Sequence, residues 1–514
     1  MNERRRPHRR GRGPRPHGYS PSNEPYGETD PYRDPADPAT GSTLAGPPQA
    51  AGEGAPGAGD AGGAYAESGG GTEPPPRYDN ATPASNDGQA QPPAPGQAFQ
   101  QGHPFQQQHG HLHQGRRGRR NRRGRQRPGG EQQPAGPPPV LVPDGATEGW
   151  FDPARDAGFI RRAAHSYLAE IGDAYVLPHF VRQSGLRRGD LISAVTGHDH
   201  RGRVLVTEIT TVNGDDPALA LKRPDFNTLT ASYPERKLTL ETGRPAKGGP
   251  ELTRRAIDLI APIGYGQRAL IVAPSRAGKT MLLQAITEGV ALNHPNVVLL
   301  ILLVDERPEE VSEAISWGVG EVIASSFDQP ATRHVEVTEM TLERAHRLVE
   351  QGKDVVIVLD SLTRMARGFN TVERGTGRTL SGGLDSSAMA RPKAFFGSAR
   401  SIAPEHGGGS LTIIATALIE TGSRMDDVIF EEFKGTGNCE IKLDRSLSEK
   451  RIYPAFDIGM SGTRKEEKLF RDDQLPAVYT LRRGLQQMPP TSAMEWLIKR
   501  IAATPNNDAL LTGL

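Results

Sequence analysis

The chain has 514 residues, enough for two or three domains, and a net charge of +1 that hides an uneven distribution. Its hydrophobic content of 35% is low for a chain that is globular throughout. No apolar run approaches the roughly 18 residues of a membrane span, and no apolar stretch follows the basic N-terminus. We therefore expect a cytoplasmic protein without a membrane partner or a secretory signal.

The N-terminal part has almost nothing to bury. Before Val140, the only Leu, Ile or Val residues are Leu44 and Leu112. Such a segment cannot offset the entropy lost on ordering, so residues 1–145 are predicted to be a disordered tail rich in Gly, Pro, Gln and Arg.

The basic residues of the tail are all arginines, and the first lysine of the chain is Lys222. They cluster at Arg4–Arg15 and Arg116–Arg127. Arginine with glycine spacers favours flexible contact with RNA or another polyanion, and a solubilising linker is the alternative.

Residues 146–225 are predicted to form a small OB-like or cold-shock-like β-barrel. Runs such as DAYVLPHFV, DLISAV and RVLVTEITTV have β-branched and aromatic content and are separated by turn residues. Phe159, Arg161 and Tyr175 are candidate contacts to single-stranded RNA, through base stacking and phosphate binding. Core positions for Phe159 and Tyr175 are an equal alternative. Residues 226–250 are predicted to be a linker.

Residues 251–514 are predicted to form a doubly wound α/β domain. Continuous apolar runs, which suit strands buried on both faces of a parallel sheet, alternate with helical stretches. The predicted strands are RALIVA (268–273), VVLLILLV (297–304), DVVIVL (354–359) and LTIIATAL (411–418). After about residue 440 the pattern is less regular. The single cysteine, Cys439, excludes a disulfide framework and is expected to be a small buried residue.

A phosphate-binding loop follows the first of these strands and opens a helix. It comprises Ala273, Pro274, Ser275, Arg276, Ala277, Gly278, Lys279 and Thr280. The segment fits the pattern G-x-x-x-x-G-K-S/T, except that Ala273 stands at the first glycine. Its backbone N–H groups are expected to cradle nucleotide phosphates, with Lys279 on the β and γ phosphates and Thr280 on Mg²⁺.

Acidic residues end two further strands. Asp360 follows DVVIVL and is predicted to hold the metal, as strand ends of a parallel sheet share one edge. Glu306 follows VVLLILLVD and is predicted to be the base that activates water, while Asp305 or Glu310 are alternatives as structural ion-pair partners.

Hydrolysis also requires positive charge opposite the γ phosphate. Arg451 and Arg464 are candidates for that charge, supplied by a neighbouring subunit. Spacing in the sequence does not separate them from surface arginines.

Long segments of the α/β region resemble the bacterial transcription termination factor Rho family. They are VDERPEEV, FDQPATRHVEVTEM, VLDSLTRMAR, RPKAFFGSAR, SLTIIATALIETGSRMDDVIFEEFKGTGN and SGTRKEE. The resemblance covers about residues 148–505. It also accounts for Ala273, because the phosphate loop of that family resembles APxxAGKT.

The resemblance implies a RecA-like P-loop ATPase domain in a homohexameric ring. It implies an RNA-dependent ATPase and 5′-to-3′ RNA helicase, with ATP and Mg²⁺ as cofactors, that acts on the RNA polymerase elongation complex to terminate transcription. The implied site residues are Glu306 as catalytic glutamate, Arg307 beside it, Arg464 as a finger in trans, Arg451 as a second interfacial arginine, and Tyr453 and Met281 against the adenine.

The resemblance also implies two RNA-contacting pore loops. One contains Arg378, Ser381, Gly382 and Gly383, and the other is Gly422–Arg424. In both loops arginine stands where the family often has lysine, so phosphate contact should be retained.

The N-terminal half departs from the family pattern. The stacking motif of the barrel reads Asp156-Ala157-Gly158-Phe159, with one aromatic missing. Acidic and aromatic residues expected near Gly202–Val204 are absent, and we expect the disordered tail in place of the small helical domain that the family carries ahead of its barrel. These departures bear on pyrimidine preference, and we hypothesise that the Arg-rich tail compensates with less specific RNA binding.

Two other functions compete with this prediction. A ring ATPase of the rotary or export class shares the P-loop, but not VDERPEEV or RPKAFFGSAR. A non-catalytic RNA-binding scaffold would not need intact Lys279, Glu306 and Asp360.

Overall fold

The computed structural model describes residues 142–246, 249–373 and 381–514. The predicted tail lies outside this part except for its last four residues. The first strand begins at Pro143, inside the segment predicted to be tail, so the barrel starts slightly earlier than expected. Arg378 of the first predicted pore loop also lies outside the described residues.

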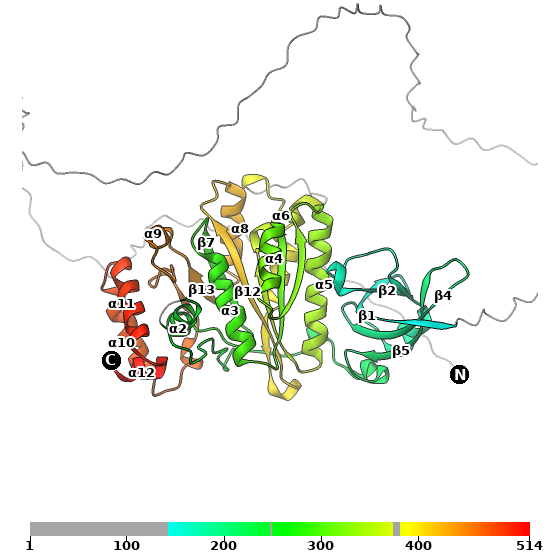
Figure 1. Ribbon diagram of the computed structural model, residues 1–514, viewed down its shortest axis with the longest axis horizontal. Coiled ribbons are helices and arrows are strands. Elements are labelled where there is room, and N and C mark those ends of the chain that lie inside the picture. Colours follow the sequence, from blue (N-terminus) through cyan, green and yellow to red (C-terminus); the bar gives the residue numbers. More distant parts are fainter. Residues whose placement is uncertain (1–141, 247–248, 374–380) are drawn as a thin grey trace, which may run out of the picture. The chain divides into compact units, whose positions relative to one another are not determined.

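Five strands form a closed barrel in the order β1-β2-β3-β5-β4 (Figure 1). Their bounds are β1 Pro143–Ala154, β2 Ala157–Arg161, β3 Ala174–Val176, β4 Leu191–His198 and β5 Val204–Val212. The barrel core is apolar and includes Phe151, Ile160, Val176, Ile192 and Val206, each of which is 0% exposed. The predicted small barrel is therefore present.

One predicted strand of the barrel is shorter than expected. The run DAYVLPHFV contributes β3 only as far as Val176, and α1 (Pro178–Ser184) follows. Pro178 occupies the first helical turn, where its fixed φ suits a helix and its missing N–H leaves no bond unmade. The apolar content alone did not reveal this start signal.

The second domain contains a nine-stranded sheet whose main order is β14-β13-β7-β12-β10-β8-β9. The bounds of its strands are β6 Ala231–Ser232, β7 Arg268–Pro274, β8 Val298–Glu306, β9 Glu321–Ser326, β10 Asp354–Asp360, β11 Arg400–Ile402, β12 Ser410–Ile419, β13 Cys439–Lys442 and β14 Gly462–Thr463. Strands β13, β7, β12, β10, β8 and β9 pair in parallel, which confirms the predicted parallel sheet and its four strands.

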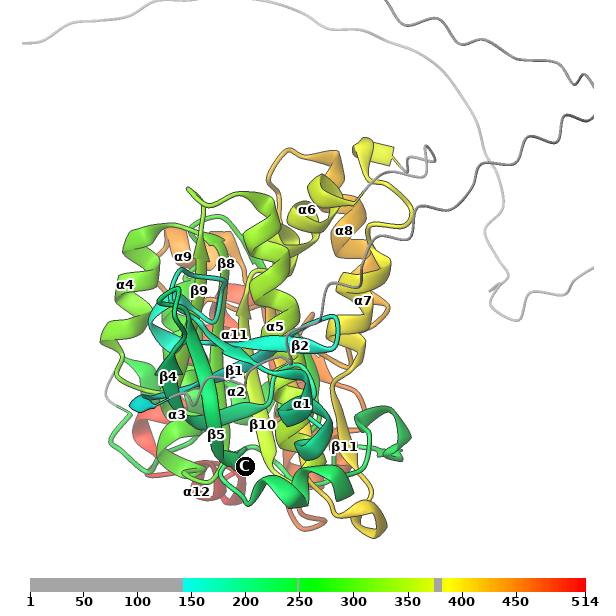
Figure 2. The same ribbon diagram turned by 90° about the vertical axis from the view of Figure 1, so that its right-hand side faces the viewer.

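Helices cover both faces of this sheet (Figures 1 and 2). They are α2 Pro250–Ile260, α3 Lys279–Asn293, α4 Pro308–Ser316, α5 Ala331–Glu350, α6 Leu362–Val372, α7 Ala390–Gly397, α8 Arg424–Lys434, α9 Arg445–Glu449, α10 Leu475–Gln486, α11 Pro490–Ala503 and α12 Asn507–Thr512. Short 3-10 helices are η1 Ala163–His165, η2 Pro217–Lys222, η3 Phe226–Thr228, η4 Ser381–Gly383, η5 Pro404–His406 and η6 Glu466–Lys468. Of the described helices, none is long and apolar enough to cross a membrane.

Successive residues of the central strands enter two different cores. On β8, Ile301 and Leu303 pack with α2 and α3, whereas Leu300 and Leu302 pack with α5 and α6. This alternation explains why the interior of β8, from residue 298 to residue 304, is apolar at every position. The irregular region after about residue 440 holds α10, α11 and α12, whose residues Leu481, Leu497 and Leu510 enter the first core.

Several residues of the segment predicted to be a linker are packed against the α/β domain. Leu238 and Leu240 are fully buried in its core, and β6 pairs with β11. The ring of Phe226 lies 3.9 Å from the ring of His346, and the Arg400 guanidinium lies 4.8 Å from the Phe226 ring. The linker prediction is therefore wrong for this stretch, because its scattered apolar residues bury individually without forming a periodic pattern.

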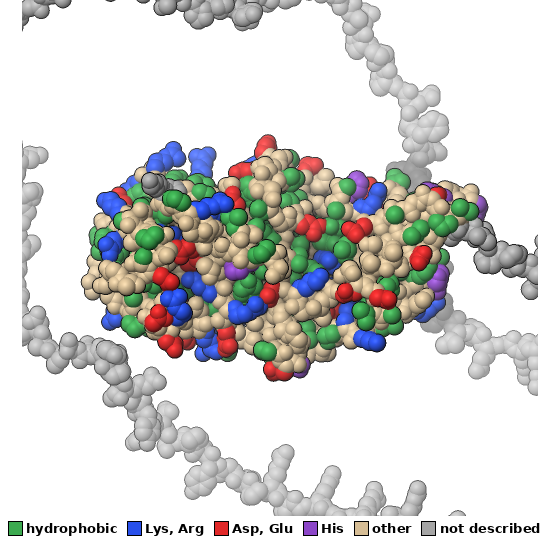
Figure 3. All heavy atoms as spheres, turned by 60° about the horizontal axis from the view of Figure 1, so that its bottom comes forward, with side chains coloured by type: hydrophobic (Ala, Val, Ile, Leu, Met, Phe, Trp, Pro, Cys, Tyr) green, Lys and Arg blue, Asp and Glu red, His purple; other side chains and the backbone are tan. Residues whose placement is uncertain are grey.

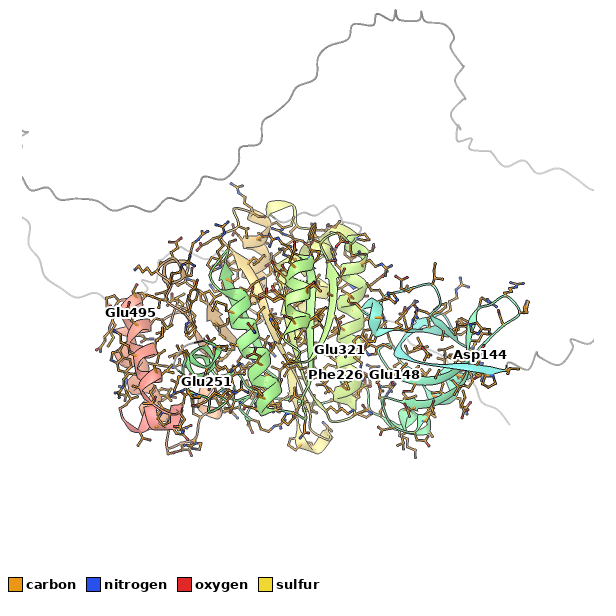
Figure 4. The ribbon with its side chains drawn as sticks, viewed as in Figure 1. Asp144, Glu148, Phe226, Glu251, Glu321 and Glu495 are labelled. Atoms are coloured by element: carbon orange, nitrogen blue, oxygen red, sulfur yellow. The ribbon has the colours of Figure 1, made fainter. Side chains whose placement is uncertain are left out.

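The barrel contacts the α/β domain through an aromatic and charged cluster. Tyr167 stacks on Trp150 with ring centroids 3.4 Å apart, and its hydroxyl donates a hydrogen bond to Glu321. Figure 4 labels Glu321 and Phe226 at the side of the sheet that meets the barrel. Burial and this carboxylate raise the pKa of Tyr167 well above its ordinary value. A Cβ at Gly189 would lie 2.5 Å from the backbone nitrogen of Arg344, so glycine permits the close approach.

Candidate nucleotide and RNA sites

The predicted phosphate loop connects the end of β7 to the start of α3. Between them, Arg276 and Gly278 adopt positive φ values of 64° and 91°. A Cβ at Gly278 would lie 3.2 Å from Cε1 of Tyr453, so both the backbone and the neighbouring ring favour glycine here. The structure thus places Tyr453 directly beside the phosphate loop.

A cavity of about 750 Å³ opens above this loop. It is lined by Pro274, Ser275, Arg276, Gly278, Lys279, Thr280, Met281, Glu306, Arg307, Glu310, Arg364, Leu418, Arg445 and Tyr453. Ala273 and Ala277 are buried, while Met281 is 54% exposed at the cavity. Ten residues predicted from the sequence are therefore brought together at one site.

Lys279 is the charged centre of the cavity. Its Nζ lies 2.6 Å from Oδ2 of Asp360 and 3.5 Å from Oε1 of Glu306. The Thr416 hydroxyl donates a 2.6 Å hydrogen bond to Oδ1 of Asp360 and so fixes that carboxylate. Burial opposes the lysine charge, but Asp360 and Glu306 raise the pKa of Lys279 above its ordinary value, so it stays cationic.

Glu306 is 1% exposed, and its Oε1 lies 3.1 Å from Nε of Arg364. Burial and the neighbouring Asp360 raise the pKa of Glu306 to about 8, against the opposing effect of Lys279. Burial likewise opposes ionisation of Glu310, but hydrogen bonds with Glu306 and Arg307 lower the pKa of Glu310. A carboxyl with a pKa near neutrality is suited to exchange a proton at physiological pH.

Three carboxylates are close enough to hold a cation. One oxygen from each of Glu306, Glu310 and Asp360 lies within 4.8 Å of the others, and this is the cluster of potential metal ligands found in the described part of the chain. The Thr280 side chain lines the same cavity. Hard oxygen donors of this kind fit Mg²⁺, which is bound through one or two carboxylates together with phosphates.

Asp305 and Glu306 point to different environments although they are neighbours. Asp305 has a positive φ of 58°, and its carboxylate lies 3.7 Å from Arg364 and 3.9 Å from His334. Asp305 is thus a structural ion-pair partner, which is the alternative role given to it from the sequence. Glu306 instead lines the cavity. Glu310 takes part in both roles, because it pairs with Arg307 at 2.8 Å and belongs to the carboxylate cluster.

Arg451 and Arg464 are not among the residues that line the nucleotide cavity. Both are exposed. Arg464 lines a separate cavity of about 170 Å³ with Lys434, Asn438 and Glu440. Within one chain, the structure does not bring these two arginines to Lys279.

Sequence reasoning missed two arginines of the cavity. Arg364 lies in the first turn of α6, which begins two residues after Asp360, so its side chain stays near the edge where β10 ends. That spacing was available as a signal. Arg445, the first residue of α9, had no signal, because its position depends on how α9 packs.

The described residues of the two predicted pore loops lie side by side. A Cβ at Gly382 would lie 2.6 Å from the backbone nitrogen of Met425 and 2.8 Å from the carbonyl carbon of Arg424. Gly382 and Gly383 have φ values of 80° and 82°. The glycines therefore let η4, which includes Ser381, sit against the start of α8, where Arg424 is located.

The predicted RNA contacts of the barrel also form one cluster. The rings of Phe159 and Tyr175 pack edge to face with centroids 5.4 Å apart, and the Arg161 guanidinium lies 4.9 Å from the Phe159 ring. Asp152 and Asp173 hold Arg161 at 2.7 and 3.0 Å. Both rings are half-buried and neither belongs to the barrel core, so the alternative of core positions is wrong.

Charge on the wider surface is mixed. On the face in Figure 3, Lys and Arg side chains alternate with Asp and Glu. Since no single-sign region dominates that face, RNA contact is better argued from local clusters than from net charge.

The prediction for Cys439 is confirmed, as it is 3% exposed and burial raises its pKa to about 12.

Comparison with known proteins agrees with this geometry. Residues 147–218 match the Rho termination factor, RNA-binding domain, and residues 253–463 match the ATP synthase alpha/beta family, nucleotide-binding domain. A transcription termination factor Rho of Cereibacter sphaeroides is 51% identical over 352 residues, which cover 68% of this chain and 82% of that protein. The chain belongs to the transcription termination factor Rho family. Its second domain is a RecA-like P-loop ATPase domain, as the resemblance implied.

A second Rho relative extends well beyond the matched region. The Rho of Gemmatimonas aurantiaca is 74% identical over 371 residues, covering 72% of this chain but only 50% of its own length. Among solved structures, a prototypical ATPase from the type III secretion system of pathogenic bacteria superposes with a TM-score of 0.46 at 23% identity, over 55% of this chain and 86% of that one.

Proposed function

We propose that this protein is a cytoplasmic, ATP-dependent RNA translocase and helicase that binds nascent RNA and terminates transcription by RNA polymerase. The observation that carries the proposal is a cavity lined by the phosphate loop, Lys279 and Glu306, where Nζ of Lys279 also contacts Asp360 at 2.6 Å. Membership of the Rho family and the aromatic–arginine cluster on the barrel support RNA as the second ligand.

The geometry supports specific roles at the nucleotide. The N–H groups at the start of α3 bind the phosphates of ATP, and Lys279 exchanges its carboxylate partners for the β and γ phosphates. Thr280 and Asp360 would hold Mg²⁺, which when bound neutralises phosphate charge. Glu306 accepts the proton of the attacking water, and Arg307 lies at the same cavity wall.

The adenine and the neighbouring subunit complete the site in this proposal. Tyr453 and Met281 line the cavity and offer apolar surface to the base. Arg464 and Arg451 are exposed outside the cavity of their own chain, which supports their action on the nucleotide of the next subunit in a homohexamer.

Transcript release is the decisive test of this function. Stalled RNA polymerase elongation complexes with labelled RNA are incubated with the full-length protein and ATP, and released RNA is counted. We expect release that depends on ATP and is lost in Lys279→Ala. RNA-independent hydrolysis without release would favour an export-class ATPase, and RNA binding without hydrolysis would favour a scaffold.

The barrel cluster gives a separate prediction. Phe159→Ala and Tyr175→Ala should each weaken binding of a single-stranded RNA by about 5- to 150-fold, because one stacked base is worth about 1–3 kcal/mol. Fluorescence anisotropy with a labelled oligonucleotide at fixed salt measures this change. Tyr479→Ala, which removes a 41% exposed aromatic on α10, is the control and should bind as the wild type does. Equal affinity of all four proteins would exclude the cluster as an RNA site.

A further inference from the structure

Arg445 lines the nucleotide cavity without a role in the function proposed above. It opens α9, and the preceding Asp444 accepts a 2.7 Å hydrogen bond from the backbone nitrogen of Ser446 that fixes the helix start. The backbone nitrogen of Leu443 also donates to Val272 of β7, the strand that continues into the phosphate loop. Figure 1 shows α9 at the same end of the sheet as the label of β7. The backbone therefore holds Arg445 beside that loop.

The side chain of Arg445 is held only loosely. Its Nη1 lies 4.0 Å from Oε2 of Glu420, and its Nε lies 3.6 Å from Oε1 of Glu449. All three side chains are well exposed, at 46%, 58% and 70% respectively. Both distances exceed those of a hydrogen bond, so the guanidinium can exchange these partners for a phosphate, whose geometry it matches.

Glu420 connects this arginine to the second pore loop. It directly follows β12, whose Ile419 is in register with Pro274 of the phosphate loop, and it has a positive φ of 56°. The next residue, Thr421, donates a 2.6 Å hydrogen bond to the buried Asp426 of α8. Glu420 thus occupies a left-handed position between the nucleotide edge of the sheet and the loop Gly422–Arg424.

We propose that Arg445 is a positioning residue that contacts the nucleotide phosphates in cis and, by leaving Glu420, couples nucleotide occupancy to the loop Gly422–Arg424. This proposal rests on the proposed function, since it requires ATP in the cavity and RNA at the loop. It adds a residue that would give up its loose 4.0 Å pairing with Glu420 for a phosphate, because a bidentate charge-assisted contact is the stronger of the two.

Nucleotide binding and RNA coupling test the two halves separately. The full-length protein and its Arg445→Ala, Arg445→Lys and Glu420→Gln variants are titrated with a fluorescent ATP analogue, and hydrolysis is measured with and without single-stranded RNA. We expect Arg445→Ala to raise the Kd about tenfold, as the loss of one charged phosphate contact does, and Arg445→Lys to recover part of that loss. Glu420→Gln should keep the Kd within about threefold but reduce the stimulation by RNA at least about threefold.

Arg471→Ala is the matched control, because Arg471 is also exposed and pairs with two carboxylates, Asp473 and Asp508, away from the cavity. An unchanged Kd in Arg445→Ala, or unchanged RNA stimulation in Glu420→Gln, would overturn the proposal. If the wild type itself showed no RNA-stimulated hydrolysis, the proposed function would fail, whereas the Kd titration would still decide whether Arg445 contacts the nucleotide.

Discussion

Replacing Glu306 by Gln is expected to lower kcat for ATP hydrolysis by about 10²- to 10⁴-fold, the range that a positioned general base contributes. The amide keeps the shape of the side chain but cannot take a proton from water. Because Lys279 and the phosphate loop remain, the Kd for ATP should stay within about threefold. Steady-state hydrolysis and a fluorescent nucleotide titration measure the two quantities on the same protein.

The raised pKa of Glu306 adds a second readout. Since only the carboxylate accepts a proton, kcat/KM of the wild type should rise as pH increases through about 8, and the residual rate of Glu306→Gln should lack this rise. The contribution of Glu306 to folding stability changes with pH in the opposite direction. A carboxyl whose folded pKa is raised contributes stability that is present below its ordinary pKa of 4.5 and lost as pH rises through about 8. The ATP-free Gln variant should therefore gain Tm relative to the wild type as pH rises.

A charge-matched change on a neighbouring surface serves as control for Glu306. Glu313 lies exposed on α4, outside the residues that line the cavity, and Glu313→Gln should hydrolyse ATP at the wild-type rate. If Glu306→Gln kept more than about a tenth of wild-type kcat, Glu306 would not be the base, and Glu310 would become the candidate.

Replacing Arg464 by Ala should lower hydrolysis by about 10³- to 10⁵-fold, the range attributed to an arginine finger. ATP binding should persist, because Arg464 does not line the cavity of its own chain. If the finger acts in trans, mixing Arg464→Ala subunits with Lys279→Ala subunits should restore part of the activity. In such mixed rings, the intact phosphate loop of one variant meets the intact Arg464 of the other.

The mixing experiment separates action in trans from action within one chain. Each variant alone should be inactive, and activity should rise with the mixing ratio to a maximum near equal amounts. Arg483→Ala, an exposed position on α10, is the control and should leave hydrolysis unchanged in pure and mixed samples. Two inactive variants that stay inactive on mixing, although they co-assemble, would place the charge in cis or remove Arg464 from the reaction.

Much of the fold was predictable because its strands carry a strong local signal. Runs such as RALIVA and DVVIVL are buried on both faces after their first residue, so the rest of each run is continuously apolar. Short edge elements carry no such signal. β14 has two residues and β6 has two, and each is a strand only because a partner lies beside it.

The residues of the site likewise divide into those that a local strand signal predicts and those that only tertiary packing places. Asp360 and Glu306 lie at the ends of predicted strands and Lys279 lies in the loop after another, so their meeting at one edge followed from the parallel sheet. Arg445 reaches the cavity from α9, whose place depends on tertiary packing. The stacked pair Trp150 and Tyr167 also depends on tertiary packing, because it lies where the barrel contacts the α/β domain.

The parallel sheet makes the nucleotide site sensitive to strand length. Five neighbouring strands, in the order β13-β7-β12-β10-β8, each end beside a residue of the site: Arg445, the phosphate loop, Glu420, Asp360 and Glu306. Deleting one residue within β10 would displace Asp360 by about 3.3 Å along the strand and turn its side chain to the other face. Insertions in the connections at the opposite edge would leave these five ends in place, so evolution can lengthen such connections while the strand interiors keep their lengths.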